Sequence, residues 1–257
     1  MARFPILLSI PHGGMKNPVE LEHNITLTKK DLFEDSDSYT NSIYDLTGKV
    51  NAVVKSEIAR AFIDLNRAPF DLPPLNTDGV IKSATCYNKQ IYDNDVYANN
   101  GLVKKLLDKY YYPYFKQIQD HLSTEKIDIA LDCHSMASIG PPVSSEPGIK
   151  RQPKICLGNS NGKTCPNDIV EKLAECFRTS FSLNVDDVTI NDPFSGGYIT
   201  RTYGMKPIPW IQVEMNRSLY LDERWFDQSN LRMNQSKLKQ LNKSFYYALK
   251  LLFTNGL

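Results

Sequence analysis

The strongest constraint on how this chain folds is the run Ile127-Asp-Ile-Ala-Leu-Asp-Cys-His-Ser135, an apolar strand pattern that ends abruptly in polar residues. Side chains along a strand alternate between its two faces, so Asp132 and His134 share one face while Leu131 and Cys133 share the other. In open α/β sheets, ligands bind beyond the carboxyl ends of the strands, where a histidine can act as a metal ligand or a general base. A buried histidine that bonds to a neighbouring carbonyl explains the pattern equally well.

The same pattern recurs in three other apolar runs, which cover residues 4–10, 61–67 and 208–217. Polar side chains lie at or just after the end of each run: His12, Asn66 with Arg67, and Glu214. Strands that meet in one sheet bring their carboxyl ends together, so we expect these side chains to converge on one site.

Each of these side chains has a structural explanation as well as a functional one. Arg67 suits bidentate binding of a carboxylate, with Asn66 as a neutral donor, but an arginine at a strand end is also a common surface charge. Glu214 either pairs with an arginine or faces a cleft in which its pKa is tuned for base catalysis. Residues 194–203 combine a glycine pair with Arg201, which exposes donors to an anion or simply forms a turn before a helix.

Two of the four histidines, His12 and His134, lie at the ends of apolar runs. Two histidines and one carboxylate make a three-ligand catalytic zinc site, in which the fourth position is left for water and a nearby glutamate is the base. Asp37 is a possible carboxylate ligand and belongs to an acidic segment that is expected to open a short helix. Acidic residues at a helix start also serve capping and the helix dipole.

The remaining patterns predict helices packed on a sheet. Short strands are expected at 52–54, 154–157 and 185–190, and helices over 102–122 with a kink at Pro113, from Pro166, and over 222–253. The Pro-rich stretch 68–95 is expected to be an ordered loop that forms a wall or lid of the site, and 136–152 a second loop.

Composition excludes several classes of protein. With 257 residues, 41% of them hydrophobic, the chain suits one large domain, here residues 1–257. A net charge of +1 draws the protein neither to nucleic acid nor to an anionic membrane, and no apolar stretch approaches the roughly 20 residues of a membrane span. The apolar N-terminal run contains Pro5 and is expected to be a strand, not a signal peptide. Five cysteines without paired spacing favour reduced thiols and a cytoplasmic protein.

Five motifs together resemble those of one known family. They are Pro11-His12-Gly13-Gly14, Asp64-Leu-Asn-Arg67, Asp132-Cys-His-Ser135, Gly196-Gly-Tyr-Ile-Thr-Arg201, and the Glu214 strand followed by Tyr220-Leu-Asp222. In this order they resemble the N-formylglutamate amidohydrolases, or N-formylglutamate deformylases, relatives of zinc carboxypeptidases and aspartoacylase-like deacylases. The resemblance covers nearly the whole chain. It implies a single metallohydrolase domain, a three-layer α/β/α sandwich around a mixed, mainly parallel sheet.

The resemblance also implies roles for individual residues. One zinc ion would be bound by His12, His134 and an acidic residue of the Asp35-to-Asp37 turn, preferably Asp37, with Asp35 and Glu34 as the alternatives. Glu214 would be the general base, and Asp132 would orient the site. Arg67 would stabilise the carbonyl oxygen, and substrate contacts would come from Asn66, Arg67 and Arg201.

The implied activity is hydrolysis of N-formyl-L-glutamate to formate and L-glutamate. One alternative is a related zinc hydrolase that acts on another N-acyl amino acid or on a peptide C-terminus. A second is a non-catalytic protein of the same fold that binds carboxylates. One departure from the family is visible, because Gly13 stands where the family commonly has serine, which removes a hydroxyl beside His12.

Overall fold

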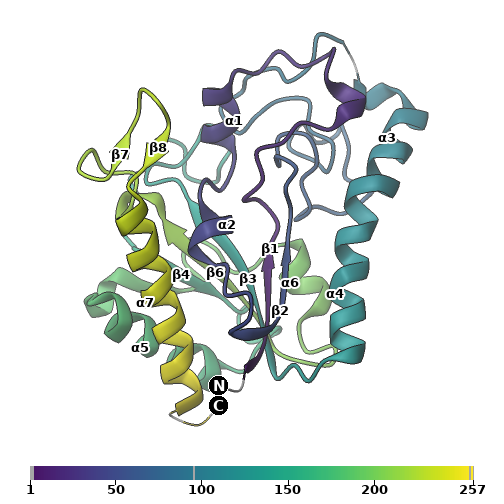
Figure 1. Cartoon of the computed structure of the whole chain (residues 1–257). Helices are drawn as coiled ribbons and strands as arrows, with labels where there is room; N and C mark the ends of the chain where they lie inside the picture. The colour runs from purple at the N-terminus through teal and green to yellow at the C-terminus, as the bar shows by residue number, and fades with distance from the viewer. Residues whose placement is uncertain (1–2, 95, 255, 257) are drawn as a thin grey trace.

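Six strands form a mixed sheet at the centre of the computed structural model, which describes residues 3–94, 96–254 and 256 (Figure 1). The strands are β1 (Phe4–Ile10), β2 (Val50–Lys55), β3 (Ile129–Met136), β4 (Ile155–Gly158), β5 (Val188–Ile190) and β6 (Trp210–Asn216). They lie in the order β2-β1-β3-β6-β4-β5, and neighbours are parallel except β4 and β6. The carboxyl ends of β2, β1, β3 and β6 therefore share one edge of the sheet.

Helices cover both faces of this sheet (Figure 1). One face carries α2 (Thr40–Ile43), α5 (Asn167–Phe181) and α7 (Gln235–Thr254), and the other carries α3 (Asn100–Leu106), α4 (Tyr112–Thr124) and α6 (Tyr198–Tyr203). Alternation along β1 separates the two cores, because Ile6 and Leu8 pack with the first set and Leu7 with the second. The predicted three-layer sandwich with a mixed, mainly parallel sheet is confirmed.

The smaller elements lie mostly in the connections. Helix α1 (Lys29–Asp35) lies beyond the carboxyl end of β1, and β7 (Phe226–Asp227) pairs with β8 (Arg232–Met233) in a short hairpin (Figure 1). Short 3₁₀ helices cover Val19–Leu21, Val96–Ala98, Val185–Asp187 and Arg217–Leu219. No helix in the described ranges is both long and apolar enough to cross a membrane.

The kinked helix predicted over 102–122 runs from Asn100 to Thr124. Its middle turn, Leu107–Tyr111, is π-helical and lies just before Pro113 in the sequence. Proline has no N–H to donate to the preceding turn, and a widened turn absorbs that missing bond. Asn99 begins the helix by accepting a hydrogen bond from the Leu102 backbone N–H at 3.1 Å.

The strand predicted over 61–67 is wrong, because this segment forms consecutive turns. The Asp64 side chain accepts a hydrogen bond from the Asn66 backbone N–H at 2.9 Å, and the Phe62 N–H bonds to the Ala59 carbonyl at 3.0 Å. Asp and Asn offer the backbone such local partners in place of a strand ladder.

Three other boundaries differ from the sequence prediction for similar reasons. The last helix begins at Gln235. The Asn234 side chain caps it by accepting hydrogen bonds from the backbone N–H groups of Ser236 and Lys237, at 2.9 and 3.1 Å. The strand expected over 185–190 covers only Val188–Ile190, since a 3₁₀ turn precedes it. Most of the acidic segment, which was predicted to precede a helix, forms the helix α1. A capping box between Thr28 and Asp31 begins this helix, and it ends before Asp37.

Candidate active site

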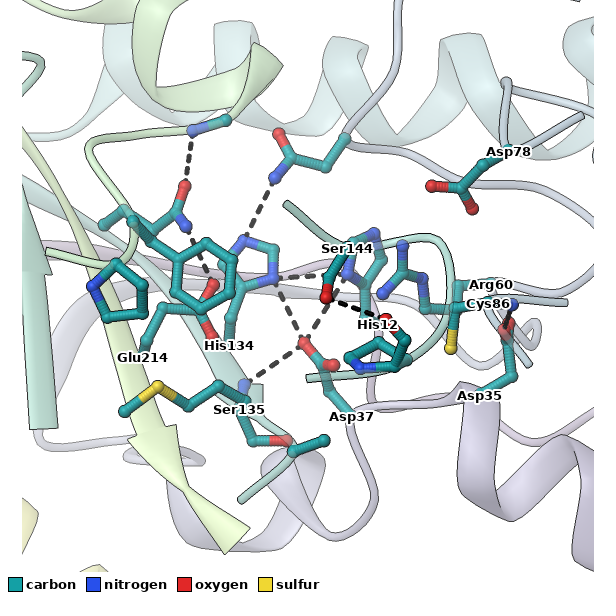
Figure 2. A pocket seen from close by; sticks show the side chains of 18 of the residues that line it. His12, Asp35, Asp37, Arg60, Asp78, Cys86, His134, Ser135, Ser144 and Glu214 are labelled. Carbon is teal, nitrogen blue, oxygen red and sulfur yellow. Dashed lines mark hydrogen bonds and ion pairs between the residues drawn. The ribbon is translucent and has the colours of Figure 1, made fainter. Parts of the chain in front are cut away.

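A cavity of about 390 Å³ lies at the carboxyl ends of the central strands, and Figure 2 shows some of the side chains that line it. His12 follows β1, while His134 and Glu214 lie on β3 and β6. Asn66 reaches the same cavity from the turns that follow β2. The polar ends of the four apolar runs therefore converge as predicted, although one of the runs is not a strand.

Three buried side chains point toward one another in this cavity (Figure 2). His134 Nδ1 lies 3.2 Å from His12 Nδ1 and 3.1 Å from Asp37 Oδ2, and His12 Nδ1 lies 3.5 Å from Asp37 Oδ2. Zinc–nitrogen bonds of about 2.0–2.1 Å in a tetrahedron place neighbouring donors about 3.3–3.4 Å apart. The spacing and the chemistry of these donors fit a tetrahedral metal ion.

A second carboxylate contacts the far nitrogen of each histidine. Asp64 Oδ1 lies 2.8 Å from His12 Nε2, and Asp132 Oδ2 lies 3.1 Å from His134 Nε2. A carboxylate on one ring nitrogen fixes the proton there and leaves the other nitrogen free as a ligand. The orienting role predicted for Asp132 agrees with this geometry.

Asp64 has an equivalent role that the sequence pattern does not reveal. Its carboxylate is fully buried and accepts a 2.7 Å hydrogen bond from Arg60. Burial acts to raise the pKa of Asp64, but the neighbouring Arg60 and His12 hold that pKa well below its usual range. Asp64 belongs to the Asp64-to-Arg67 motif, but only the turn in this segment brings it to His12.

The structure favours Asp37 as the third ligand over its two neighbours. Asp37 receives a 3.2 Å contact from Arg217 at the oxygen that does not face the histidines. Asp35 instead pairs with the fully buried Lys82 at 3.1 Å, and the nearest cation to Glu34 is a surface lysine at 3.7 Å. Neither alternative carboxylate joins the cluster of possible ligands.

Arg217 also holds the acidic segment against β3 and β6. Its Nε donates to Ser135 Oγ at 3.0 Å, and its Nη1 donates to the Glu34 carbonyl at 2.9 Å. The Ser135 backbone N–H donates to Asp37 at 3.2 Å, which adds a second contact to the same carboxylate. Arg217 is the last residue of an apolar run, as Arg67 is. This position in the sequence could have indicated that Arg217 lies at the site.

Glu214 lies in the same cavity as His12, Asp37 and His134, the candidate metal site, and is only 6% exposed. It is paired with His134 in the register of β3 and β6, and Gln212 Nε2 donates to its Oε1 at 2.8 Å. Burial is the main cause that raises the pKa of Glu214 to about 7, and nearby His134 acts in the opposite direction. A carboxylate with such a pKa can exchange protons near neutral pH.

The remaining predicted residues line the same cavity. Asn66 Oδ1 accepts from the Ile199 N–H at 2.9 Å, and Arg67 donates to the Asp78 carbonyl at 2.8 Å and pairs with its carboxylate. Arg201 is exposed and donates from Nη1 to the Gly196 carbonyl. Their roles in binding substrate stay predictions.

The sequence matches the N-formylglutamate amidohydrolase family over residues 4–221. The chain belongs to this family. An N-formylglutamate deformylase from Pseudomonas putida is 29% identical over 232 residues, which are 86% of this chain and 83% of that protein. A second, from Pseudomonas aeruginosa, is 25% identical over 236 residues, 86% of this chain and 84% of that protein.

The fold agrees with a solved structure that carries the family name. The crystal structure of N-formylglutamate amidohydrolase from Ralstonia eutropha JMP134 matches with a TM-score of 0.80, covering 100% of this chain and 96% of that chain. At 18% identity, this likeness supports the shared fold alone.

The structure leaves no room for a side chain at Gly13. A Cβ atom at Gly13 would lie 2.5 Å from Asn41 Oδ1 and 2.7 Å from the Asn41 backbone nitrogen. Asn41 is held by a 2.9 Å hydrogen bond from its Nδ2 to the Ser56 carbonyl. In this member of the amidohydrolase family, the asparagine therefore takes the space that a serine side chain would need.

The described part of the long loop predicted over 68–95, residues 68–94, forms one wall of the amidohydrolase cavity through Asp78, Cys86 and Tyr87. Lys82 in this loop is fully buried and pairs with Asp78 at 2.7 Å as well as with Asp35. These contacts agree with the predicted wall. Movement of the loop as a lid stays a prediction.

Proposed function

We propose that this protein is a zinc-dependent amidohydrolase that removes the formyl group from N-formyl-L-glutamate and releases formate and L-glutamate. The observation that carries the proposal is the cluster of His12, Asp37 and His134 beside the buried Glu214. Family membership and the named deformylase relatives support the amide bond as the bond that breaks.

His12, Asp37 and His134 would hold the zinc ion through the three atoms that face one another. Zinc bound there would polarise the formyl carbonyl and lower the pKa of a water molecule toward about 7. Asp64 and Asp132 would keep the two imidazole rings in the tautomer that leaves Nδ1 free.

Glu214 would move the proton during the reaction. It would accept a proton from the attacking water as the new carbon–oxygen bond forms, and deliver it to the amide nitrogen as the carbon–nitrogen bond breaks. Burial raises its pKa to about 7 in the metal-free protein, which favours proton uptake, and the hydrogen bond from Gln212 holds the carboxylate in place. General acid–base catalysis of this kind typically contributes about 10²–10⁴-fold.

Arg67, Asn66 and Arg201 would contact the substrate, and Arg67 keeps one donor available for it. Arg67 Nη1 has no hydrogen-bond partner among the described residues, and it would donate to the formyl oxygen as negative charge develops there. Removing such a donor typically raises the barrier by about 2.7–4 kcal/mol. Asn66 Nδ2, 3.5 Å from His134 Nε2, and Arg201 would contact the substrate carboxylates.

The test is release of formate by purified, zinc-loaded protein from a panel of N-formyl and N-acetyl amino acids and C-terminal dipeptides. We expect the highest kcat/KM for N-formyl-L-glutamate. A higher kcat/KM for an acetyl or peptide substrate would contradict the substrate assignment and support the related zinc hydrolase. No hydrolysis of any of them would contradict the enzyme assignment.

A further inference from the structure

Five arginines line the described part of the cavity, and protein carboxylates neutralise them unequally. Three of them form ion pairs with aspartates: Arg60 with Asp64, Arg67 with Asp78, and Arg217 with Asp37. Arg151 and Arg201 form none with any residue that the structure describes. Two cations without an anion match the two carboxylates of a dicarboxylate ligand.

Arg151 differs from Arg201 because it is only 8% exposed. Its one side-chain hydrogen bond within the described residues runs from Nη1 to the Ala137 carbonyl at 3.1 Å, and its buried Nε has no partner. A buried guanidinium without a carboxylate is unfavourable, and burial lowers the pKa of Arg151. Arg201 is exposed, so water can solvate its charge.

Both the backbone and the guanidinium of Arg151 are held in position. Its backbone N–H donates to the Ser138 carbonyl at 2.9 Å, and its carbonyl accepts from Asn216 Nδ2 at 3.4 Å. The guanidinium lies 4.8 Å from the ring centroid of Phe194, another cavity residue. A guanidinium fixed on a ring loses little conformational freedom when it binds a planar carboxylate.

We propose that Arg151 binds one carboxylate of the N-formyl dicarboxylic amino acid and that Arg201 binds the other. This inference rests on the proposed function and adds a specificity-determining residue to it. Arg67 and Arg217 are less suitable for a carboxylate, because Asp78 and Asp37 already neutralise their charges. Attraction to the nearby carboxylates of Glu214 and Glu146 is the competing explanation for Arg151, and the experiment separates it from substrate binding.

The experiment measures kcat and KM for N-formyl-L-glutamate, for N-formyl-L-glutamine, which lacks the side-chain carboxylate, and for the α-amide of N-formylglutamate. The proteins are the zinc-loaded wild type, Arg151→Met, Arg151→Lys and the control Arg224→Met, whose side chain is 77% exposed and lies outside the cavity. Arg151→Met should lose about 10- to 100-fold in kcat/KM on N-formylglutamate, mainly through KM. Arg151→Lys should lose less, because it keeps the charge but not the fork.

The decisive result is a change of specificity. Arg151→Met should no longer prefer N-formylglutamate over one of the two monoamides, and it should keep the wild-type preference over the other. The ratio of kcat/KM for two substrates on one preparation does not depend on the folded fraction, so partial misfolding cannot produce this result. An equal loss of kcat on all three substrates would show that Arg151 acts through Glu214 and not on a substrate carboxylate, and it would overturn the inference. Unchanged kinetics would also overturn it.

Calorimetric titration with L-glutamate tests the same inference without turnover. Arg151→Met should bind this dicarboxylate at least about 10-fold more weakly than the wild type and Arg224→Met. Equal affinities would overturn the inference. If wild type releases no formate while Arg151→Met still binds glutamate more weakly, the proposed function fails and the carboxylate-binding role of Arg151 stands.

Discussion

Two groups of charged residues lie in and around the cavity that holds the candidate metal site of His12, Asp37 and His134, and only one of the two groups is neutralised within the protein. The paired group comprises Asp35, Arg60, Asp64, Asp78 and Lys82, in which every charge has an opposite partner within 3.1 Å. Figure 2 shows Asp35, Arg60 and Asp78 on one side of the cluster and Glu214 on the other.

The unpaired group comprises Glu214, Arg151 and Arg201, which form no ion pair with any described residue. A buried pair that is satisfied within the protein fixes structure, whereas a buried charge without a partner is available to a substrate or to a proton. The paired group should therefore set stability and metal geometry, and the unpaired group should set chemistry and specificity.

The largest expected effect is on turnover when Glu214 of the unpaired group becomes Gln. Glu214→Gln should lose about 10²–10⁴-fold in kcat, because the amide cannot carry the proton. Its zinc content and melting temperature should stay close to those of the wild type. Steady-state kinetics with metal analysis and thermal unfolding check this, and near-normal kcat at full zinc content would show that Glu214 is not the base.

The next effect is on stability when Lys82 of the paired group becomes Met. Lys82→Met should lower the free energy of unfolding by about 3–5 kcal/mol, because it leaves the buried Asp35 without its cation, whereas Asp78 keeps its pair with Arg67. Denaturant unfolding of the zinc-free protein measures this effect. A loss below about 1 kcal/mol would show that the network does not hold the loop over 68–95 in place.

The effect of Lys82→Met should also depend on pH. Burial acts to raise the pKa of Asp35, but Lys82 and Arg60 hold it below its ordinary value. A carboxylate with a lowered pKa stabilises the fold above its unfolded pKa of about 3.9, and this contribution is lost as the pH falls through the lower folded value. The difference between wild type and Lys82→Met should be largest near pH 7 and smaller in acid. A difference that grows in acid would contradict this explanation.

The smallest effect is on metal affinity, and it compares the two carboxylates behind the histidines. Asp64→Asn and Asp132→Asn should each weaken zinc binding by about 10- to 100-fold, measured by competition with a chelator. Asp64→Asn should also destabilise the zinc-free protein, because it leaves Arg60 unpaired. Asp132→Asn should destabilise it less, since Asp132 accepts hydrogen bonds from the neutral Ser9 and Thr200 hydroxyls. Equal destabilisation by Asp64→Asn and Asp132→Asn would contradict the view that only Asp64 neutralises a buried cation.

The sequence predicts the parts of this molecule that follow from strand periodicity. The apolar runs before His12 and His134 alternate or stay apolar as buried parallel strands do, so both their position and their convergence could be foreseen. Asn66 reaches the same cavity as His12 and His134, although its segment forms turns and not the predicted strand. The motif therefore identifies the right residue but not its secondary structure.

Contacts between segments that are far apart in the chain could not be read from the sequence. Asp64 and His12 are separated by 52 positions, and Lys82 and Asp35 by 47, so no local pattern connects them. Arg151 lies in a loop rich in proline and glycine, and only the burial of its side chain distinguishes it from a surface arginine. Pairing and burial are properties of the folded chain. They distinguish the charged residues that stabilise the fold from those that are available to a substrate.

The most direct test of the account is a titration of chelator-treated protein with zinc, in which bound metal and formate release from N-formyl-L-glutamate are measured on the same samples. We expect binding of one zinc ion per chain, with formate release rising in proportion to it, and loss of both in His134→Ala. Metal-free protein that releases formate at the full rate would contradict the central role of His12, Asp37 and His134.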